Sequence, residues 1–198
     1  MSELLRRRGR RADAEHSRQA VLAAAIRLLD DRPDTTLAEI AAGAGVTRQT
    51  VYAHFGARRD LLVAVMDLLT HDYLAALDAA ELDQGSAIEA LSRFVEVGRS
   101  SMRLNSTSAH TISAALDPAE SQARHVLVLD RLIALARRGQ DSGEFDDEVP
   151  ADWLAAATIS LSHTAAAENA AGRLTTEQAE QALHRSLMHL YGIARNPI

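Results

Sequence analysis

The sequence predicts an all-α fold. Almost every segment of the 198-residue chain places apolar residues three or four positions apart, and almost none alternates as a strand does. Recognisable helix starts and stops separate these segments. The chain is 47% hydrophobic, which suffices for one sizeable core or for a small module and a larger one.

The first predicted helix covers residues 14–31 and ends at the sequence DDRPDT. Its apolar face consists of Leu22, Ala25, Ile26 and Leu29. Three later helix starts carry a capping box, in which a hydroxyl and a carboxylate or amide satisfy free backbone N–H groups. These boxes are Thr36 with Glu39, Ser86 with Glu89, and Thr175 with Gln178.

Other start and stop signals locate the remaining helices. Asp117 followed by Pro118 marks a further start, and Gly139 and Gly172 are expected to end helices. We therefore expect about nine helices. They cover residues 14–31, 37–44, 48–54, 57–82, 87–104, 107–115, 118–138, 150–171 and 176–194.

Charge is unevenly distributed along the chain. The net charge is −6, but residues 1–60 hold 11 Arg and 8 acidic residues, whereas residues 61–198 hold 10 Arg and 19 acidic residues. Five of the N-terminal arginines crowd into the stretch RRRGRR: Arg6, Arg7, Arg8, Arg10 and Arg11. Such a compact positive arm suits contact with phosphates, while a disordered solubilising tail is the simpler interpretation of this stretch alone.

Several classes of protein are disfavoured. The chain has no Cys, and it lacks HExxH, a Gly-rich phosphate loop and GxSxG. His184 and His189 are five apart and so fall on different helix faces, and the acids of DSGEFDDE (141–148) have the wrong spacing for calcium. We interpret that stretch as an exposed, mobile connector. No apolar run is long enough for a membrane span or signal peptide, so we expect a cytoplasmic protein without cofactor or metal.

Two very short predicted helices lie next to each other near residue 45. Leu37, Ile40 and Ala41 form the inner face of the first, while Val46 and Val51 continue the buried side. Gly45 occupies a turn position where a Cβ would be awkward. This is helix-turn-helix spacing, in which the second helix lies in the DNA major groove and its N-terminal residues meet base edges.

The second short helix carries many hydrogen-bonding groups within GAGVTRQTVYAHFGARRDLL (43–62). They belong to Thr47, Arg48, Gln49, Thr50, Tyr52 and His54. Arg can bond guanine O6 and N7 together, Gln can bond adenine N6 and N7, and Thr can bond a base or touch a thymine methyl. Thr47 is also the expected N-cap.

The stretch TLAEIAAGAGVTRQTVYAHFGARRDLL resembles the DNA-binding domain of the TetR family of bacterial transcriptional regulators. The likeness rests on the capping Thr, the AGVT turn, the Tyr-x-His-Phe helix end and the basic residue before a Leu-Leu pair. It implies that Thr36, Tyr52 and His54 contact the DNA backbone and that Arg48 and Gln49 read bases. Phe55 would fill the small core. Arg58 is also an expected DNA contact and stands where the family usually has Lys; the arginine keeps the charge but adds a planar fork.

The resemblance also implies a homodimer on double-stranded operator DNA, with two reading helices one DNA turn, roughly 34–36 Å, apart. Residues 151–171 are apolar nearly all round, so a helix there needs partners on more than one side. A stripe on the last helix is the second candidate for the dimer contact: Leu183, Leu187, Leu190 and Ala194. The alternative is that both helices serve only the core of one chain.

Members of this family commonly hold a small-molecule effector among their middle helices. Candidate pocket residues combine apolar and polar groups on otherwise buried-looking helices. They are Tyr73, Phe94, Met102, Asn105, His110, Thr111, Trp153, Ser160 and His163. Each could instead be a core or surface residue; for Trp153 the alternative is that it anchors its helix on the core.

The sequence therefore predicts a TetR-like repressor that leaves its operator when an effector binds. Residues 1–60 would form the basic arm and a three-helix helix-turn-helix domain, and residues 61–198 a helical ligand-binding and dimerisation domain. Two alternatives remain open, a ligand-independent architectural DNA-binding protein and an all-α enzyme. An enzyme would consume a bound compound, and an architectural protein would ignore it.

Overall fold

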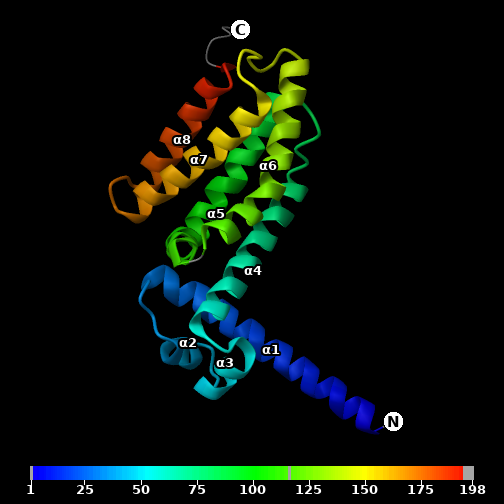
Figure 1. Cartoon of the computed structure of the whole chain (residues 1–198), viewed down its shortest axis with the longest axis vertical. Coiled ribbons are helices and arrows are strands. Elements are labelled where there is room, and N and C mark those ends of the chain that lie inside the picture. Colours follow the sequence, from blue (N-terminus) through cyan, green and yellow to red (C-terminus); the bar gives the residue numbers. More distant parts are fainter. Residues whose placement is uncertain (1, 116, 194–198) are drawn as a thin grey trace. The chain divides into compact units, whose positions relative to one another are not determined.

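The structure, a computed structural model, describes residues 2–115 and 117–193, with the backbone alone for 2–8, 10, 11, 102–111, 113–115 and 118–123. Over these residues it contains eight helices and no strand, which confirms the predicted all-α fold (Figure 1). The helices are α1 (Ser2–Asp31), α2 (Leu37–Gly43), α3 (Arg48–Phe55), α4 (Arg58–Ala79), α5 (Ala87–Ala115), α6 (Pro118–Asp141), α7 (Ala151–Ala170) and α8 (Thr176–Leu190).

The chain forms two compact units. The first unit comprises Met1–Leu69 and Thr107–Leu116, and the second comprises Thr70–Ser106 and Asp117–Ile198. Helices α4 and α5 contribute residues to both units. The domain boundary expected from the sequence, at residue 60, falls in the first turn of α4 and inside the first unit.

The core of the first unit forms where α1, α2 and α3 pack together with the start of α4. The two short helices lie beside the second half of α1 (Figure 1). As predicted, Ile40, Ala41, Val51 and Phe55 are buried, and burial of such side chains stabilises a fold by about 1.5–3 kcal/mol for each large one. Ile112 of α5 joins this core.

Two helix boundaries differ most from the prediction. The expected break between residues 104 and 107 does not occur, because α5 continues through Asn105 and Ser106. Neither Gly nor Pro stands there, and Asn or Ser lowers helix stability by less than about 0.7 kcal/mol. Helix α1 begins at Ser2 rather than at residue 14, so the backbone of the arginine-rich stretch is helical. Arg, Leu and Ala are all strong helix formers.

The helix starts that were predicted from capping boxes and from Pro118 are confirmed. Thr36 with Glu39 and Thr175 with Gln178 form complete capping boxes. Ser86 and Glu89 exchange the same two hydrogen bonds, of 3.3 and 3.1 Å. Helix α6 begins at Pro118, and α7 ends just before Gly172, whose φ of +69° places it in the left-handed region that favours glycine.

In the second unit α7 packs between α6 and α8 (Figure 1). Leu183 and Leu187 of α8, which the sequence assigned to the dimer contact, are buried in the core of the chain itself. The half-buried Leu190 packs against the same core, and Ala194 lies outside the described residues. For Leu183 and Leu187 the predicted dimer contact was therefore wrong, because these two residues pack in the core of their own chain.

Most residues of the segment 141–148 are exposed, as predicted for a connector, but the segment also contributes to the core of the second unit. Phe145 is buried, and its ring meets that of Tyr191 with centroids 4.8 Å apart. A Cβ on Gly139 would lie 2.1 Å from the Phe145 ring. Gly139 therefore permits close packing inside the last turn of α6 and does not end that helix, which continues to Asp141.

Glu144 from the same segment caps α5. Its carboxylate accepts hydrogen bonds from the backbone N–H groups of Ala87 (3.0 Å) and Ile88 (3.1 Å). These bonds hold the pKa of Glu144 below its usual value. The acid-rich segment thus stabilises the start of a helix more than 50 positions earlier in the chain.

Candidate nucleic-acid interface

The geometry of α3 begins with its cap. The Oγ1 of Thr47 accepts a hydrogen bond from the Thr50 N–H at 3.1 Å and lies 2.9 Å from the Thr50 hydroxyl. Gly45, in the turn before it, has a φ of +68°, and nothing lies within 4 Å of where its Cβ would be. Glycine is needed there for backbone conformation and not for space.

Exposure separates the two faces of α3. Thr47, Arg48 and Gln49 are exposed, and 42% of the surface of Tyr52 is accessible to solvent. Val51 and Phe55, on the opposite face, are buried. The helix thus presents hydrogen-bonding groups outward from a surface whose other side is fixed by core packing, as base reading requires.

Arg48 and Tyr52 form a pair one helical turn apart. The Arg48 Nη2 donates to the Tyr52 hydroxyl at 3.1 Å, and the guanidinium carbon lies 5.4 Å from the centroid of the ring. A cation held over an aromatic face in this way is attracted by about 0.5–1 kcal/mol at an exposed site. The pair restricts the directions in which Arg48 can point.

His54, at the end of α3, is held by α1. Its Nε2 lies 2.8 Å from the Ser17 Oγ, and that hydroxyl donates to the Ala14 carbonyl at 2.9 Å. Since the hydroxyl proton is used there, His54 donates its Nε2 proton to Ser17. The next residue of α1, Arg18, places its guanidinium 5.6 Å from the centroid of the Phe55 ring.

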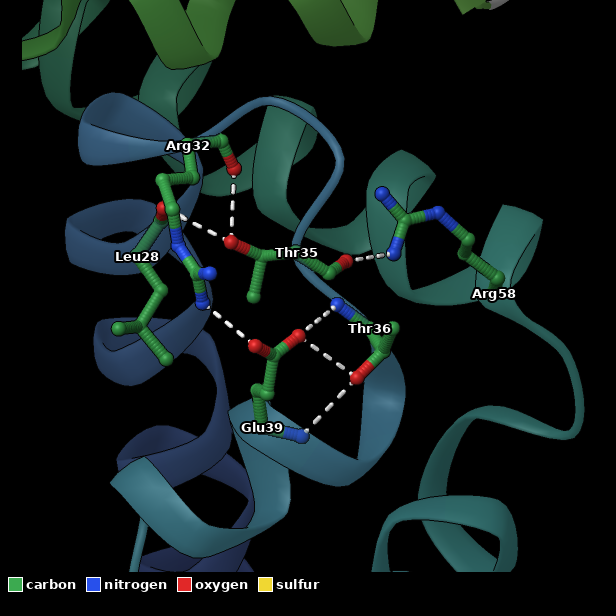
Figure 2. A network of polar contacts seen from close by, with 6 residues as sticks. All are labelled: Leu28, Arg32, Thr35, Thr36, Glu39 and Arg58. Atoms are coloured by element: carbon green, nitrogen blue, oxygen red, sulfur yellow. Dashed lines mark hydrogen bonds and ion pairs between the residues drawn. The ribbon is translucent and has the colours of Figure 1, made fainter.

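Thr36 lies in a polar network at the start of α2 (Figure 2). The Glu39 carboxylate accepts from the Thr36 N–H at 2.7 Å, from the Thr36 hydroxyl at 2.8 Å and from the Arg32 guanidinium at 2.5 Å. The bonds to Thr36, followed by that to Arg32, lower the pKa of Glu39 to about 2. The N-cap is therefore fixed to a charged carboxylate at neutral pH.

Arg58, the first residue of α4, is half-buried. Its Nη1 donates to the Thr35 carbonyl and its Nη2 donates to the Pro33 carbonyl at 3.3 Å, so the fork faces the loop between α1 and α2 (Figure 2). The structure thus gathers the predicted residues of α3, Thr36 and Arg58 into one unit. Whether they touch DNA remains a prediction.

The α1 residues that support this surface, Ser17 and Arg18, were not among those predicted from the sequence. Ser17 and Arg18 continue the core face of α1 toward the N-terminus, because they stand four positions before Val21 and Leu22, both buried. That periodicity could have placed them toward the module. The pairing of Ser17 with His54 joins residues 37 positions apart, which periodicity alone does not specify.

The predicted pocket residues fall into three groups. Tyr73 and Phe94 lie together in a cluster of the second unit whose buried members also come from α6 and α7. The side chains of Met102, Asn105, His110 and Thr111 lie outside the described residues. Trp153, Ser160 and His163 are exposed on α7.

Trp153 differs most from expectation. Its ring is 64% exposed in the single chain, so it neither anchors α7 on the core nor lies enclosed by that chain. His163 meets a residue that was not predicted, His125 of α6, with ring centroids 4.7 Å apart. Burial, followed by the nearby His163 and Arg124, lowers the pKa of His125.

Among the residues that the structure describes, no group of three or more His, Cys, Asp or Glu is arranged to hold a metal ion. Within that same part of the chain, no helix has the length and apolar character needed to cross a membrane.

Comparisons with known proteins match this architecture. The family model described as "Bacterial regulatory proteins, tetR family" matches residues 21–65. The transcriptional repressor LfrR of Mycolicibacterium smegmatis is 40% identical over 82 residues, which are 41% of this chain and 43% of LfrR. That alignment therefore spans less than half of the relative. The transcriptional regulator TtgR of Pseudomonas putida is 34% identical over 155 residues, 69% of this chain and 73% of TtgR.

Solved structures share the fold. The structure of LfrR from Mycobacterium smegmatis in complex with proflavine has a TM-score of 0.68 and 27% identity, and the match covers 88% of this chain and 95% of that one. The regulatory protein TetR from Rhodobacter sphaeroides has a TM-score of 0.75 at 18% identity, over 87% and 97% of the two chains. With the helix-turn-helix match and the likeness to most of TtgR, these findings show that the chain belongs to the tetR family of bacterial regulatory proteins and is a DNA-binding transcriptional regulator.

Proposed function

We propose that the protein is a homodimeric repressor that reads a two-fold operator through α3 and is released when a small molecule binds the second unit. Arg48 and Gln49 read base edges, while Thr47 and Thr50 line the same face. Thr36, Tyr52 and His54 contact phosphates. Regulation of this kind would operate in the bacterial cytoplasm, where operator DNA is located.

One observation carries the DNA-reading part of this proposal. The first turn of α3 exposes Arg48 and Gln49 side by side, and Val51 holds the opposite face in the core. Arg and Gln are the two side chains whose paired donors and acceptors match guanine and adenine in the major groove. A helix serving only the core would have no need of two such neighbours.

The DNA-reading test is selection of binding sites from a random DNA pool by the purified protein. The expected result is an inverted repeat whose half-sites lie about one helical turn apart. Enrichment of no sequence, together with equal binding to all duplexes, would instead support the architectural alternative.

The effector part rests on the cluster of the second unit that contains Tyr73 and Phe94. Tyr73 brings one phenol hydroxyl to this apolar cluster, and burial raises its pKa. Because residues 61–198 hold nearly twice as many acidic residues as arginines, aromatic cations are the favoured effectors. The complex of LfrR with proflavine supports this class of compound.

Proflavine is therefore the first probe. Titration into a complex of the protein with its selected operator should release DNA, and operator should weaken proflavine binding by the same factor, because linkage is reciprocal. Recovery of the dye chemically unchanged would oppose the enzyme alternative. A dye that binds without releasing DNA would contradict the effector mechanism and leave DNA recognition in place.

A further inference from the structure

Arg58 differs from the other candidate DNA contacts because its guanidinium group already donates hydrogen bonds to main-chain carbonyls of the protein. The two Nη atoms donate to the carbonyls of Thr35 and Pro33, which belong to the loop between α1 and α2. Figure 2 shows the guanidinium aimed at the Thr35 carbonyl. These carbonyls lie outside any helix, so without Arg58 their hydrogen-bonding capacity would depend on water.

Thr35 connects Arg58 to the end of α1. The Thr35 side chain is almost fully buried, at 1% exposure, and its hydroxyl lies 2.7 Å from the Arg32 carbonyl and 3.1 Å from that of Leu28. Leu28 lies in the last turn of α1 and Arg32 directly follows that helix, and their carbonyls also accept from the backbone N–H groups of Arg32 and Thr35. Thr35 thus bonds the end of α1 through its side chain and accepts from the first residue of α4 through its carbonyl.

The next residue begins α2. Thr36 is the N-cap whose box with Glu39 is tied to Arg32. The ends of α1, α2 and α4 therefore meet in one network, all within the first unit (Figure 2). Helix α3 packs on α2 and is separated from α4 by Gly56 and Ala57 alone, so its orientation depends on both neighbours.

We propose that Arg58 is a positioning residue for DNA reading, which acts by holding the 33–35 loop and not by neutralising a phosphate. The inference rests on the proposed DNA-binding function. It assigns Arg58 a role that depends on the planar fork, which can reach two carbonyls, whereas a lysine ammonium is a single point charge. Charge alone is then insufficient at this position.

Arg58→Lys and Arg58→Met separate the two roles. A positioning role predicts that both variants lose operator affinity to a similar degree, about tenfold or more, since hydrogen bonds from a charged group are lost in each. The slope of log affinity against log salt should change by much less than the roughly 0.9 expected for one phosphate contact. Arg137→Lys, in the second unit, is the matched control and should bind as the wild type does.

A phosphate-binding role predicts the opposite pattern. Arg58→Lys would then bind nearly as well as the wild type, and Arg58→Met would reduce the salt slope by about one. Either of these results overturns the proposal. A wild-type protein that selects no DNA would instead refute the proposed function, so the two failures can be told apart.

Thr35→Val gives a second test that changes no charge. Valine keeps the shape of the side chain but removes the hydroxyl bonds to the end of α1. The variant should lose operator affinity with an unchanged salt slope, and the Arg58→Lys, Thr35→Val double variant should lose less than the product of the two single effects. Independent effects that multiply fully would contradict a shared network.

Amide hydrogen exchange without DNA keeps the test independent of affinity and reports on folding. In Arg58→Lys protein the Glu39 amide, which donates to the Thr36 hydroxyl, should exchange faster, while helical amides of α7 should not change. Unchanged exchange at Glu39 in a folded Arg58→Lys variant would overturn the positioning role.

Discussion

Arg48 and Gln49 illustrate how much of this site is specified at the level of single residues. The spacing of Val51 and Phe55 determines which face of α3 is buried, so the outward direction of their polar neighbours follows from sequence. The support of His54 by Ser17 does not follow in that way, because it depends on how α1 and α3 pack. The role of Arg58 was likewise hidden, since its partners are main-chain carbonyls that no side-chain pattern reveals.

The first prediction concerns base reading. Arg48→Ala and Gln49→Ala should each relax base preference at particular operator positions by roughly 1–3 kcal/mol, because each removes a pair of hydrogen bonds to one base. Competition binding with operators changed at one base pair at a time measures this. Gln181→Ala, in the second unit, is the control and should leave every preference intact. Uniform weakening over all operator variants would show that neither residue reads bases.

The second prediction separates the hydroxyl of Tyr52 from its ring. Tyr52→Phe keeps the ring beneath the Arg48 guanidinium and removes the hydroxyl that accepts from it. Affinity should fall several-fold for all sequences alike, since a hydrogen bond contributes about 0.5–1.5 kcal/mol. Tyr52→Leu also removes the ring and should additionally weaken the base preference attributed to Arg48. Equal base preference in both variants would show that the ring does not orient Arg48.

At the level of elements, local signals predicted starts better than ends. Capping boxes involve side chains three positions apart, so Thr36, Ser86 and Thr175 mark helices without knowledge of the fold. Gly139 was misread because its small size serves contact with Phe145, which is a tertiary requirement. The surface that covers the apolar stripe of α8 also depends on tertiary packing, because the sequence pattern does not specify whether that surface belongs to the same chain or to another.

The third prediction concerns the acid stability of α2. Hydrogen bonds in the folded state lower the Glu39 pKa from 4.5 to about 2, so its contribution is fully present above pH 4.5 and is lost as the pH falls toward 2. Glu39→Gln should therefore melt at a lower temperature than the wild type at pH 6, and this difference should shrink as the pH approaches 2. Glu148→Gln, an exposed control, should show no such trend. A difference independent of pH would exclude the charged carboxylate as the cause.

At the level of the whole molecule, we expect the buried faces of the last two helices to stabilise the chain and the exposed face of α7 to form the contact between chains. Leu187 is fully buried in the core of the second unit. Leu187→Glu removes an apolar side chain from that core and buries a carboxylate there, so it should destabilise the chain by on the order of several kcal/mol. Unfolding followed by circular dichroism measures this. A folded monomeric Leu187→Glu variant would instead indicate that the residue serves only association between chains.

The exposed face of α7 is the better candidate for the two-fold contact. Trp153, Ala156 and Ser160 follow one another at helical spacing on that face, and small side chains allow close approach of two helices. Ala156→Glu should leave the fold of each chain intact and shift the sedimentation of the protein at micromolar concentration from dimer toward monomer. Ala134→Glu introduces the same charge at an exposed position of α6 and should remain dimeric.

In the wild type, dilution through the dissociation range should move the Trp153 emission to longer wavelength as the ring returns to water, and Ala156→Glu should show that emission at all concentrations. A dimer unaffected by Ala156→Glu would place the contact on another surface and would leave the 64% exposure of Trp153 without this explanation.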